Sequence, residues 1–121
     1  MHGKPIILNV SSNRRNLELL AQLLEREGYQ AHSVESLEAL DQLLSGAEKV
    51  SLALVDLTDF DKSIWDRCER LRNAKIPFLV ISPQQSANVQ RQTLAQGARG
   101  MLVKPLVMKE FLQLIRGLVA E

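Results

Sequence analysis

The feature of this sequence that most restricts its fold is a regular alternation of short apolar runs with longer amphipathic segments. The five apolar runs span residues 6–10, 30–34, 52–55, 78–81 and 101–103. Three of them are unbroken, which is typical of strands buried on both faces of a parallel sheet. The run at 30–34 is mixed and suits an edge strand, and the polar residue Asn9 interrupts the first run.

The segments between these runs have the periodicity of amphipathic helices. Apolar residues recur there at intervals of three and four, within 17–24, 37–44, 64–71, 89–95 and 111–118. Gly28 and Gly97 follow the first and fourth of these segments, as glycines that end helices commonly do. Five strand–helix units in succession predict a doubly wound α/β domain, with a parallel sheet covered by helices on both sides.

Size and composition place the chain among ordinary globular domains. Its 121 residues suit one domain, which we expect to span residues 1–121. The net charge of +1 gives no basic excess for nucleic acid, and no apolar run approaches the ~20 residues of a membrane span. A single cysteine, Cys68, excludes an internal disulfide and a multi-cysteine metal site. We therefore expect a cytoplasmic protein that binds neither nucleic acid nor membrane.

Polar residues follow the strands at the edge where open α/β sheets carry their chemistry. Ser11 and Ser12 follow the first run, and Asp56 follows the third. Ser82 ends the fourth run, and Lys104 ends the fifth. We expect these side chains to meet at an exposed edge, in a cup that suits a phosphoryl group. The cup contains no histidine base and no nucleophile beyond the carboxylate, so we expect no enzyme and assign no catalytic residue.

Five stretches, taken in order, make the whole chain resemble the receiver domain of two-component response regulators. They are residues 7–13, 16–29, 52–57, 76–82 and 97–105. The resemblance implies a flavodoxin-like (βα)5 three-layer sandwich with strand order 2-1-3-4-5. It also implies a role in bacterial two-component, or phosphorelay, signal transduction.

The resemblance assigns a role to each matching residue. Asp56 would be the phosphoryl acceptor, and Ser82 and Lys104 would contact the phosphoryl group. The peptide bond between Lys104 and Pro105 would be cis. The backbone carbonyl of Thr58 would be a magnesium ligand if magnesium bound.

The sequence departs from the family at the metal site. The acidic pair of the family falls on Ser11 and Ser12, so this site is degenerate at Ser11, Ser12 and Thr58. Mg²⁺ prefers carboxylate oxygens, and two serines supply no charge. We therefore expect no metal and no cofactor. We expect Ser11 and Ser12 to cap the first helix instead, with Asn13 as another candidate.

Three functional hypotheses follow. The leading one is an atypical receiver that acts mainly through protein–protein contact, with weak or absent Mg-dependent phosphorylation. Its partner would be a histidine kinase or an output domain, or a second copy in a homodimer, bound through a surface that includes Met101 and Leu106. The alternative is a functional receiver phosphorylated on Asp56 by a histidine kinase, with Mg²⁺ as cofactor. The third is a small-ligand or nucleotide-binding domain, although no glycine-rich phosphate loop follows the first run.

Two expectations concern side chains outside the cup. We interpret Cys68 as a small buried hydrophobe rather than a reactive thiol. A basic cluster in the same segment is expected to form a solvated helix face; it consists of Arg67, Arg70, Arg72 and Lys75. Within the cup, Lys104 should pair directly with Asp56.

Overall fold

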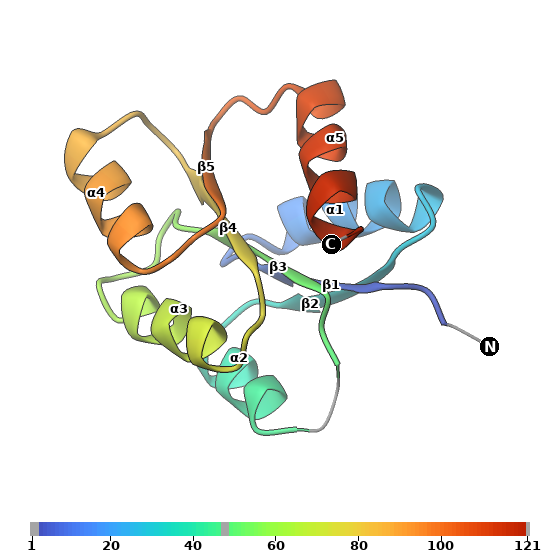
Figure 1. The fold of residues 1–121 in the computed structure, drawn as a ribbon, viewed down its shortest axis with the longest axis horizontal. Coiled ribbons are helices and arrows are strands. Elements are labelled where there is room, and N and C mark those ends of the chain that lie inside the picture. The colour runs from blue at the N-terminus through green and yellow to red at the C-terminus, as the bar shows by residue number, and fades with distance from the viewer. Residues whose placement is uncertain (1–2, 47–48, 121) are drawn as a thin grey trace.

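Five strands and five helices alternate along the chain in the computed structural model, which describes residues 3–46 and 49–120 (Figure 1). The strands are β1 (Ile6–Val10), β2 (Gln30–Val34), β3 (Leu52–Asp56), β4 (Phe78–Ser82) and β5 (Gly100–Val103). The helices are α1 (Arg14–Arg26), α2 (Leu37–Leu44), α3 (Ile64–Asn73), α4 (Ala87–Ala95) and α5 (Met108–Val119). All the elements that the apolar pattern predicts are therefore confirmed.

The strands form one parallel sheet in the order β2-β1-β3-β4-β5. This is the predicted doubly wound, flavodoxin-like topology. The order reverses between β1 and β3, so the carboxyl ends of these two strands lie at the switch point. Asp56 is the last residue of β3 and therefore lies at that edge.

The sheet separates two hydrophobic clusters because successive side chains of a strand point to opposite faces. Leu8 and Val10 of β1 pack on the side of α2 and α3. Ile7 packs on the other side, with Phe111 and Ile115 of α5. Figure 1 shows the same layers, with α1 and α5 on one side of the sheet and α2 and α3 on the other. Asn9, two residues after Ile7, belongs to the α1–α5 side.

The first helix, α1, is capped by Asn13 and not by either of the two serines before it. The side chain of Asn13 accepts a hydrogen bond from the backbone N–H of Asn16 at 3.0 Å. The expectation that Ser11 and Ser12 cap this helix is therefore wrong, and the other candidate is correct. The hydroxyls of Ser11 and Ser12 contact other backbone groups instead.

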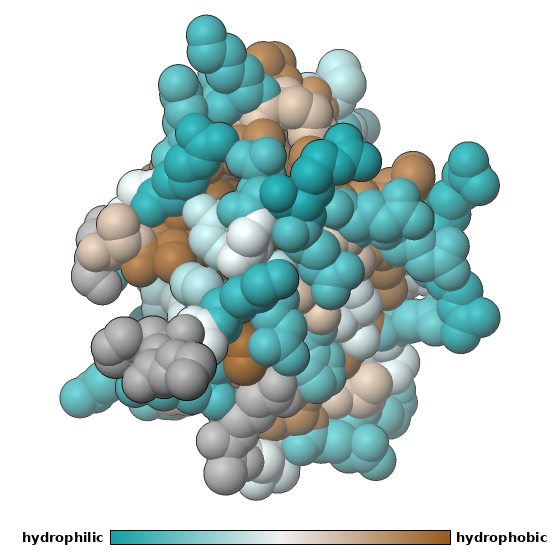
Figure 2. All heavy atoms as spheres, turned by 90° about the vertical axis from the view of Figure 1, so that its right-hand side faces the viewer, coloured by the Kyte–Doolittle hydropathy of each residue, from teal (hydrophilic) through white to brown (hydrophobic). Residues whose placement is uncertain are grey.

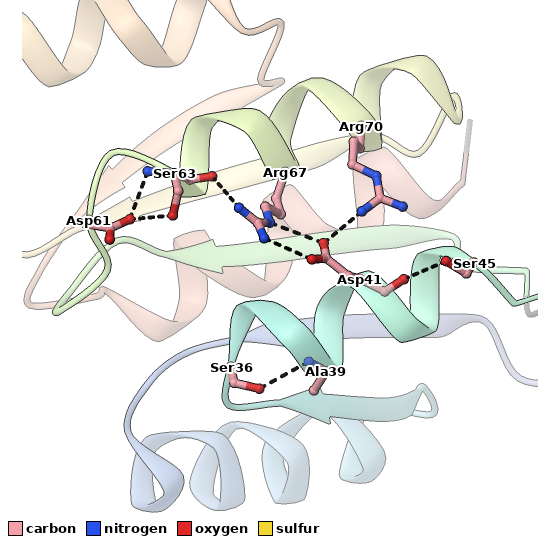
Figure 3. A network of polar contacts seen from close by, with 8 residues as sticks. All are labelled: Ser36, Ala39, Asp41, Ser45, Asp61, Ser63, Arg67 and Arg70. Carbon is pink, nitrogen blue, oxygen red and sulfur yellow. Dashed lines mark hydrogen bonds and ion pairs between the residues drawn. The ribbon is translucent and has the colours of Figure 1, made fainter.

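A network of ion pairs joins α2 to α3 (Figure 3). Two nitrogens of Arg67 contact the two carboxylate oxygens of Asp41, at 3.1 and 2.9 Å. Arg70 contacts the same carboxylate at 2.7 Å. Arg67 is thus a half-buried helix-to-helix contact, which corrects the expectation that it belongs to a solvated face. These contacts lower the pKa of Asp41, chiefly through the hydrogen bonds from Arg67.

The outer surface is mainly polar. In Figure 2, hydrophilic side chains cover most of the face and hydrophobic atoms appear as separate patches between them. Over residues 3–46 and 49–120, the structure contains no helix with the length and apolarity needed to cross a membrane.

Candidate functional site

Asp56 and Lys104 form the centre of the predicted cup. Lys104 Nζ lies 2.8 Å from Asp56 Oδ2 and 3.1 Å from Thr58 Oγ1. The backbone N–H of Thr58 donates to Asp56 Oδ1 at 3.0 Å. The direct ion pair predicted from the sequence is therefore confirmed. The expected exposed edge is wrong for the carboxylate, because only 10% of the Asp56 side chain is exposed.

The two serines that follow β1 are both engaged with backbone groups. Ser12 Oγ donates a hydrogen bond to the backbone carbonyl of Thr58 at 3.0 Å. Ser11 Oγ accepts the backbone N–H of Asn13 at 3.2 Å. Thus the carbonyl that the family resemblance assigns to magnesium accepts a hydroxyl of this chain.

Ser82 lies on the strand next to β3, and its hydroxyl is used locally. Ser82 Oγ donates to the backbone carbonyl of Gln84 at 2.6 Å and accepts the Gln84 N–H at 3.4 Å. Its backbone carbonyl accepts the N–H of Lys104 at 3.0 Å, which fixes the end of β5 beside β4. The next peptide bond, between Lys104 and Pro105, is cis as expected.

The donor set at this edge does not match the preference of Mg²⁺ for several carboxylate oxygens. The carboxylate of Asp56 lies at this edge, and Lys104 already neutralises it. Asp61, in the loop after β3, accepts hydrogen bonds from the hydroxyl and N–H of Ser63, which lower the pKa of Asp61. Within the described parts of the chain, no group of three histidine, cysteine, aspartate or glutamate residues is arranged to hold a metal.

The two residues of the predicted interaction surface lie in different places. Met101 is half-buried against the hydrophobic cluster on the α2–α3 side. Its sulfur accepts a hydrogen bond from Thr93 Oγ1 at 3.7 Å. Leu106 is half-buried on the α1–α5 side. The structure therefore does not bring these two side chains together on one face.

Two features of the edge were not identified from the sequence. The hydroxyl of Thr58 contacts Lys104, whereas the resemblance had assigned only the Thr58 carbonyl. A cavity of about 600 Å³ also adjoins Asp56 and Lys104, between α1 and the segment 104–108. Most residues that line the cavity are apolar. Apolar residues of a packed core recur with the same spacing, so the sequence pattern does not distinguish a cavity from a core.

Comparison with known proteins shows the family of this chain. The family model described as "Response regulator receiver domain" matches residues 7–116. The chain belongs to this family. A search of curated proteins found no match.

Solved structures share the fold of this receiver domain. A response regulator receiver protein from Pseudomonas putida has a TM-score of 0.86 at 22% identity, with 97% of this chain and 99% of that chain covered. A CheY-like receiver domain protein from Methanospirillum hungatei has a TM-score of 0.88 at 21% identity, with coverage of 98% and 95%. An orphan response regulator of H. pylori has a TM-score of 0.83 at 22% identity, with coverage of 98% and 99%.

The site of this receiver combines a buried carboxylate with a neighbouring ammonium group. Asp56 offers a carboxylate oxygen, and the ammonium of Lys104 can stabilise charge on an attached group. The serine hydroxyls near them contact backbone groups: Ser12 and Ser82 donate to backbone carbonyls, and Ser11 accepts a backbone N–H. The site therefore pairs the carboxylate of Asp56 with the ammonium of Lys104.

Proposed function

We propose that this receiver domain acts mainly through protein–protein contact, with weak or absent Mg-dependent phosphorylation of Asp56. The observation that carries the proposal is the hydrogen bond from Ser12 Oγ to the carbonyl of Thr58. This bond joins the loop after β1 to the loop after β3, and both groups that form it are uncharged. A bound metal would need ligands from the same two loops. This receiver thus keeps the fold of its family with an altered site.

The physical reason is the charge that develops during phosphoryl transfer. A bound metal normally neutralises the oxygens of the transferred group, and preorganised charge of this kind is a large part of catalysis. Here two hydroxyl dipoles stand where two carboxylates would hold that metal. Lys104 alone supplies positive charge, and part of it is already used by Asp56. Phosphorylation of Asp56 would therefore be slow and insensitive to Mg²⁺.

Receiver domains work with histidine kinases or output domains. For this receiver we propose a protein partner of that kind, bound in the same way whether or not Asp56 is modified. Phosphorylation can signal only if the phosphoryl group stabilises one conformation of the receiver more than another. The altered site reduces the difference between its contacts in the two conformations. Asp56→Asn should then change partner affinity by less than a factor of about two.

The alternative is a functional receiver, and the position of Asp56 favours it. The Asp56 carboxylate lies next to Lys104, and Ser82 ends the adjacent strand. In this reaction a carboxylate oxygen of Asp56 attacks the phosphorus of a donor. The bond from phosphorus to the donor breaks, and the leaving group departs with its electron pair.

Phosphotransfer from a small acyl phosphate, followed by intact-protein mass spectrometry, separates the two functions. We expect little phosphoprotein and no difference between Mg²⁺ and a chelator. The Asp56→Asn variant sets the background, and the double variant S11D/S12D provides a positive control for the donor. Rapid Mg-dependent phosphorylation of the unmodified chain, lost in Asp56→Asn, would establish the alternative and overturn the proposal.

A further inference from the structure

Helix α1 contains more leucine than its packing on the sheet requires. Five of its residues are leucine, and two of them, Leu17 and Leu24, are buried. The other three line the cavity of about 600 Å³ beside this helix: Leu19, Leu20 and Leu23. Apolar side chains that remain in contact with water do not contribute the free energy that their burial would give. The helix therefore presents an apolar surface that the domain covers only in part.

The cavity wall that faces α1 is apolar as well, and it is formed by the segment 104–108 before and at the start of α5. Within residues 3–46 and 49–120, four large apolar side chains are exposed. Leu19 and Met108 line the cavity, and Val107 is next to Met108 in the chain, whereas Leu94 lies on α4. Exposed apolar side chains that gather at one place mark a binding surface, whereas single ones need no explanation.

The shape of this surface suits a small molecule. The cavity extends between its two walls to Leu54 and Ile81 of the central strands. Its volume lies within the range of roughly 300–1,000 Å³ that is usual for ligand pockets, which are concave and mainly apolar. A stable protein–protein contact uses about 800 Å² on each partner. The three exposed side chains at the cavity supply only a part of that area, so the surface favours a ligand that enters the cavity.

The charge of the lining restricts the ligand further. The ionisable residues of the lining are Asp56 and Lys104, and they neutralise each other at 2.8 Å. A charged ligand would lose hydration in the cavity and would find no unpaired charge of opposite sign there. An uncharged ligand avoids this cost. The cavity therefore favours an uncharged, mainly apolar molecule.

We propose that this cavity binds a small uncharged molecule with a mainly apolar body. The body would lie between the leucines of α1 and the segment 104–108, and burial of its apolar surface would supply the affinity. A polar end of the ligand would stay at the open side of the cavity, where Leu19 and Met108 reach solvent. Binding would not require phosphorylation of Asp56, so the proposal does not rest on the proposed function.

A series of straight-chain alcohols tests the apolar requirement. In a protein-detected NMR titration, 1-octanol should cause saturable shifts of the backbone amides of residues that line both walls, with a Kd below about 1 mM. These residues are Leu19, Leu20, Leu23 and Leu106. Each CH₂ removed from the alcohol should weaken binding about fourfold, because the burial of that group is lost. 1-Hexanol should therefore bind roughly fifteenfold more weakly than 1-octanol.

Octanoate and octylammonium keep the chain length of 1-octanol and test the charge requirement. Both should bind more weakly than 1-octanol, because each would bring an unpaired charge to a neutral lining. Equal or tighter binding of octanoate would assign the cavity to an anion held by Lys104. Equal or tighter binding of octylammonium would assign it to a cation held by Asp56. Either result overturns the proposal.

Two variants place a charge at the open side of the cavity, one on each wall. Leu19→Glu and Met108→Glu change side chains that are 53% and 44% exposed, so the unfolding temperature should stay the same. Each variant should weaken the binding of 1-octanol about tenfold. Leu94→Glu is the matched control, because Leu94 is 65% exposed on α4 and lies outside the cavity lining. This control should bind 1-octanol as the unmodified chain does.

Three further outcomes would overturn the proposal. Absence of saturable shifts up to the solubility limit of 1-octanol would show that the cavity holds only water. Equal weakening by Leu94→Glu and Leu19→Glu would show that the alcohol binds to apolar side chains anywhere on the surface. Shifts of the same amides with protein concentration alone would assign the apolar surface to a second copy of this chain.

Discussion

The hydroxyl of Ser12 and the backbone carbonyl of Thr58 form a hydrogen bond of 3.0 Å between the loop after β1 and the loop after β3. This hydrogen bond joins the two loops through neutral groups, and a bond of this kind contributes about 0.5–1.5 kcal/mol to stability. Beside this bond, the carboxylate of Asp56 and the ammonium of Lys104 balance each other's charge. Added negative charge at this edge should disturb that balance.

An acidic pair introduced at Ser11 and Ser12 should make the stability of the domain depend on Mg²⁺. In S11D/S12D three carboxylates would lie close together, and like charges ~4 Å apart repel by up to about 4 kcal/mol at an effective dielectric near 20. We expect a lower free energy of unfolding without metal and a recovery with millimolar Mg²⁺, measured by denaturant unfolding.

The matched control for this experiment is S36D/S86D. Ser36 and Ser86 are helix N-caps elsewhere, and aspartate serves equally well at an N-cap. This variant adds the same charge without a site, so its stability should not respond to Mg²⁺. A metal response of the unmodified chain equal to that of S11D/S12D would contradict the prediction.

Removing Lys104 should destabilise the fold more than removing a surface cation does. Lys104→Met leaves the buried carboxylate of Asp56 without its charged partner, at a cost of about 1–3 kcal/mol. Asp56→Asn should cost less, and the double variant should reveal the coupling between the pair. Arg14→Met is the control, because the pair between Arg14 and Glu35 is exposed and worth about 0–1 kcal/mol. Equal losses in Lys104→Met and Arg14→Met would refute the argument.

The fold could be predicted from the sequence because burial repeats with a clear period. Unbroken apolar runs such as 78–81 leave no face for solvent, and the order of units then fixes the parallel topology. The ion pair of Asp56 with Lys104 followed from the same topology. Asp56 ends β3 and Lys104 directly follows β5, so the positions of both residues are determined by the strands of one sheet.

The contacts that the sequence did not reveal involve loops and helix faces, whose relative positions are not encoded by periodicity. Arg67 looked solvated because its neighbours in sequence are charged, but its partner Asp41 lies 26 residues earlier on α2. The Ser12 contact likewise spans 46 residues. Asn9 stood out as polar, yet only the packing shows that its side chain is buried.

The Asp41 network should make part of the stability depend on acidity. Contacts from Arg67 and Arg70 hold the pKa of Asp41 below its ordinary value of 3.8. A carboxylate with a lowered folded-state pKa stabilises above its unfolded pKa, and this stability is lost as the pH falls through the lowered value. Asp41→Asn should therefore reduce the free energy of unfolding at pH 7 and flatten its decline below pH ~4.

The control for Asp41 is Glu69→Gln. Glu69 is 53% exposed and lies 3.9 Å from Arg72 within one helix, so it should contribute little at any pH. Denaturant unfolding between neutral and acid pH measures both variants. An acid profile for Asp41→Asn that parallels the unmodified chain would show that this network contributes nothing to the pH dependence.

Cys68 should react with thiol reagents only when the protein opens. The residue is fully buried in the cluster beneath α3, and burial raises the pKa of its thiol from 9.0 to about 12. At pH 8 the reactive thiolate is therefore scarce in the folded protein, and the reagent has no access to it. We expect labelling by an aromatic disulfide to be slow in native buffer and rapid in denaturant, at a rate that follows the unfolded fraction. Cys68→Ala should remove the signal, and rapid native labelling would mean that α3 does not stay packed on the sheet.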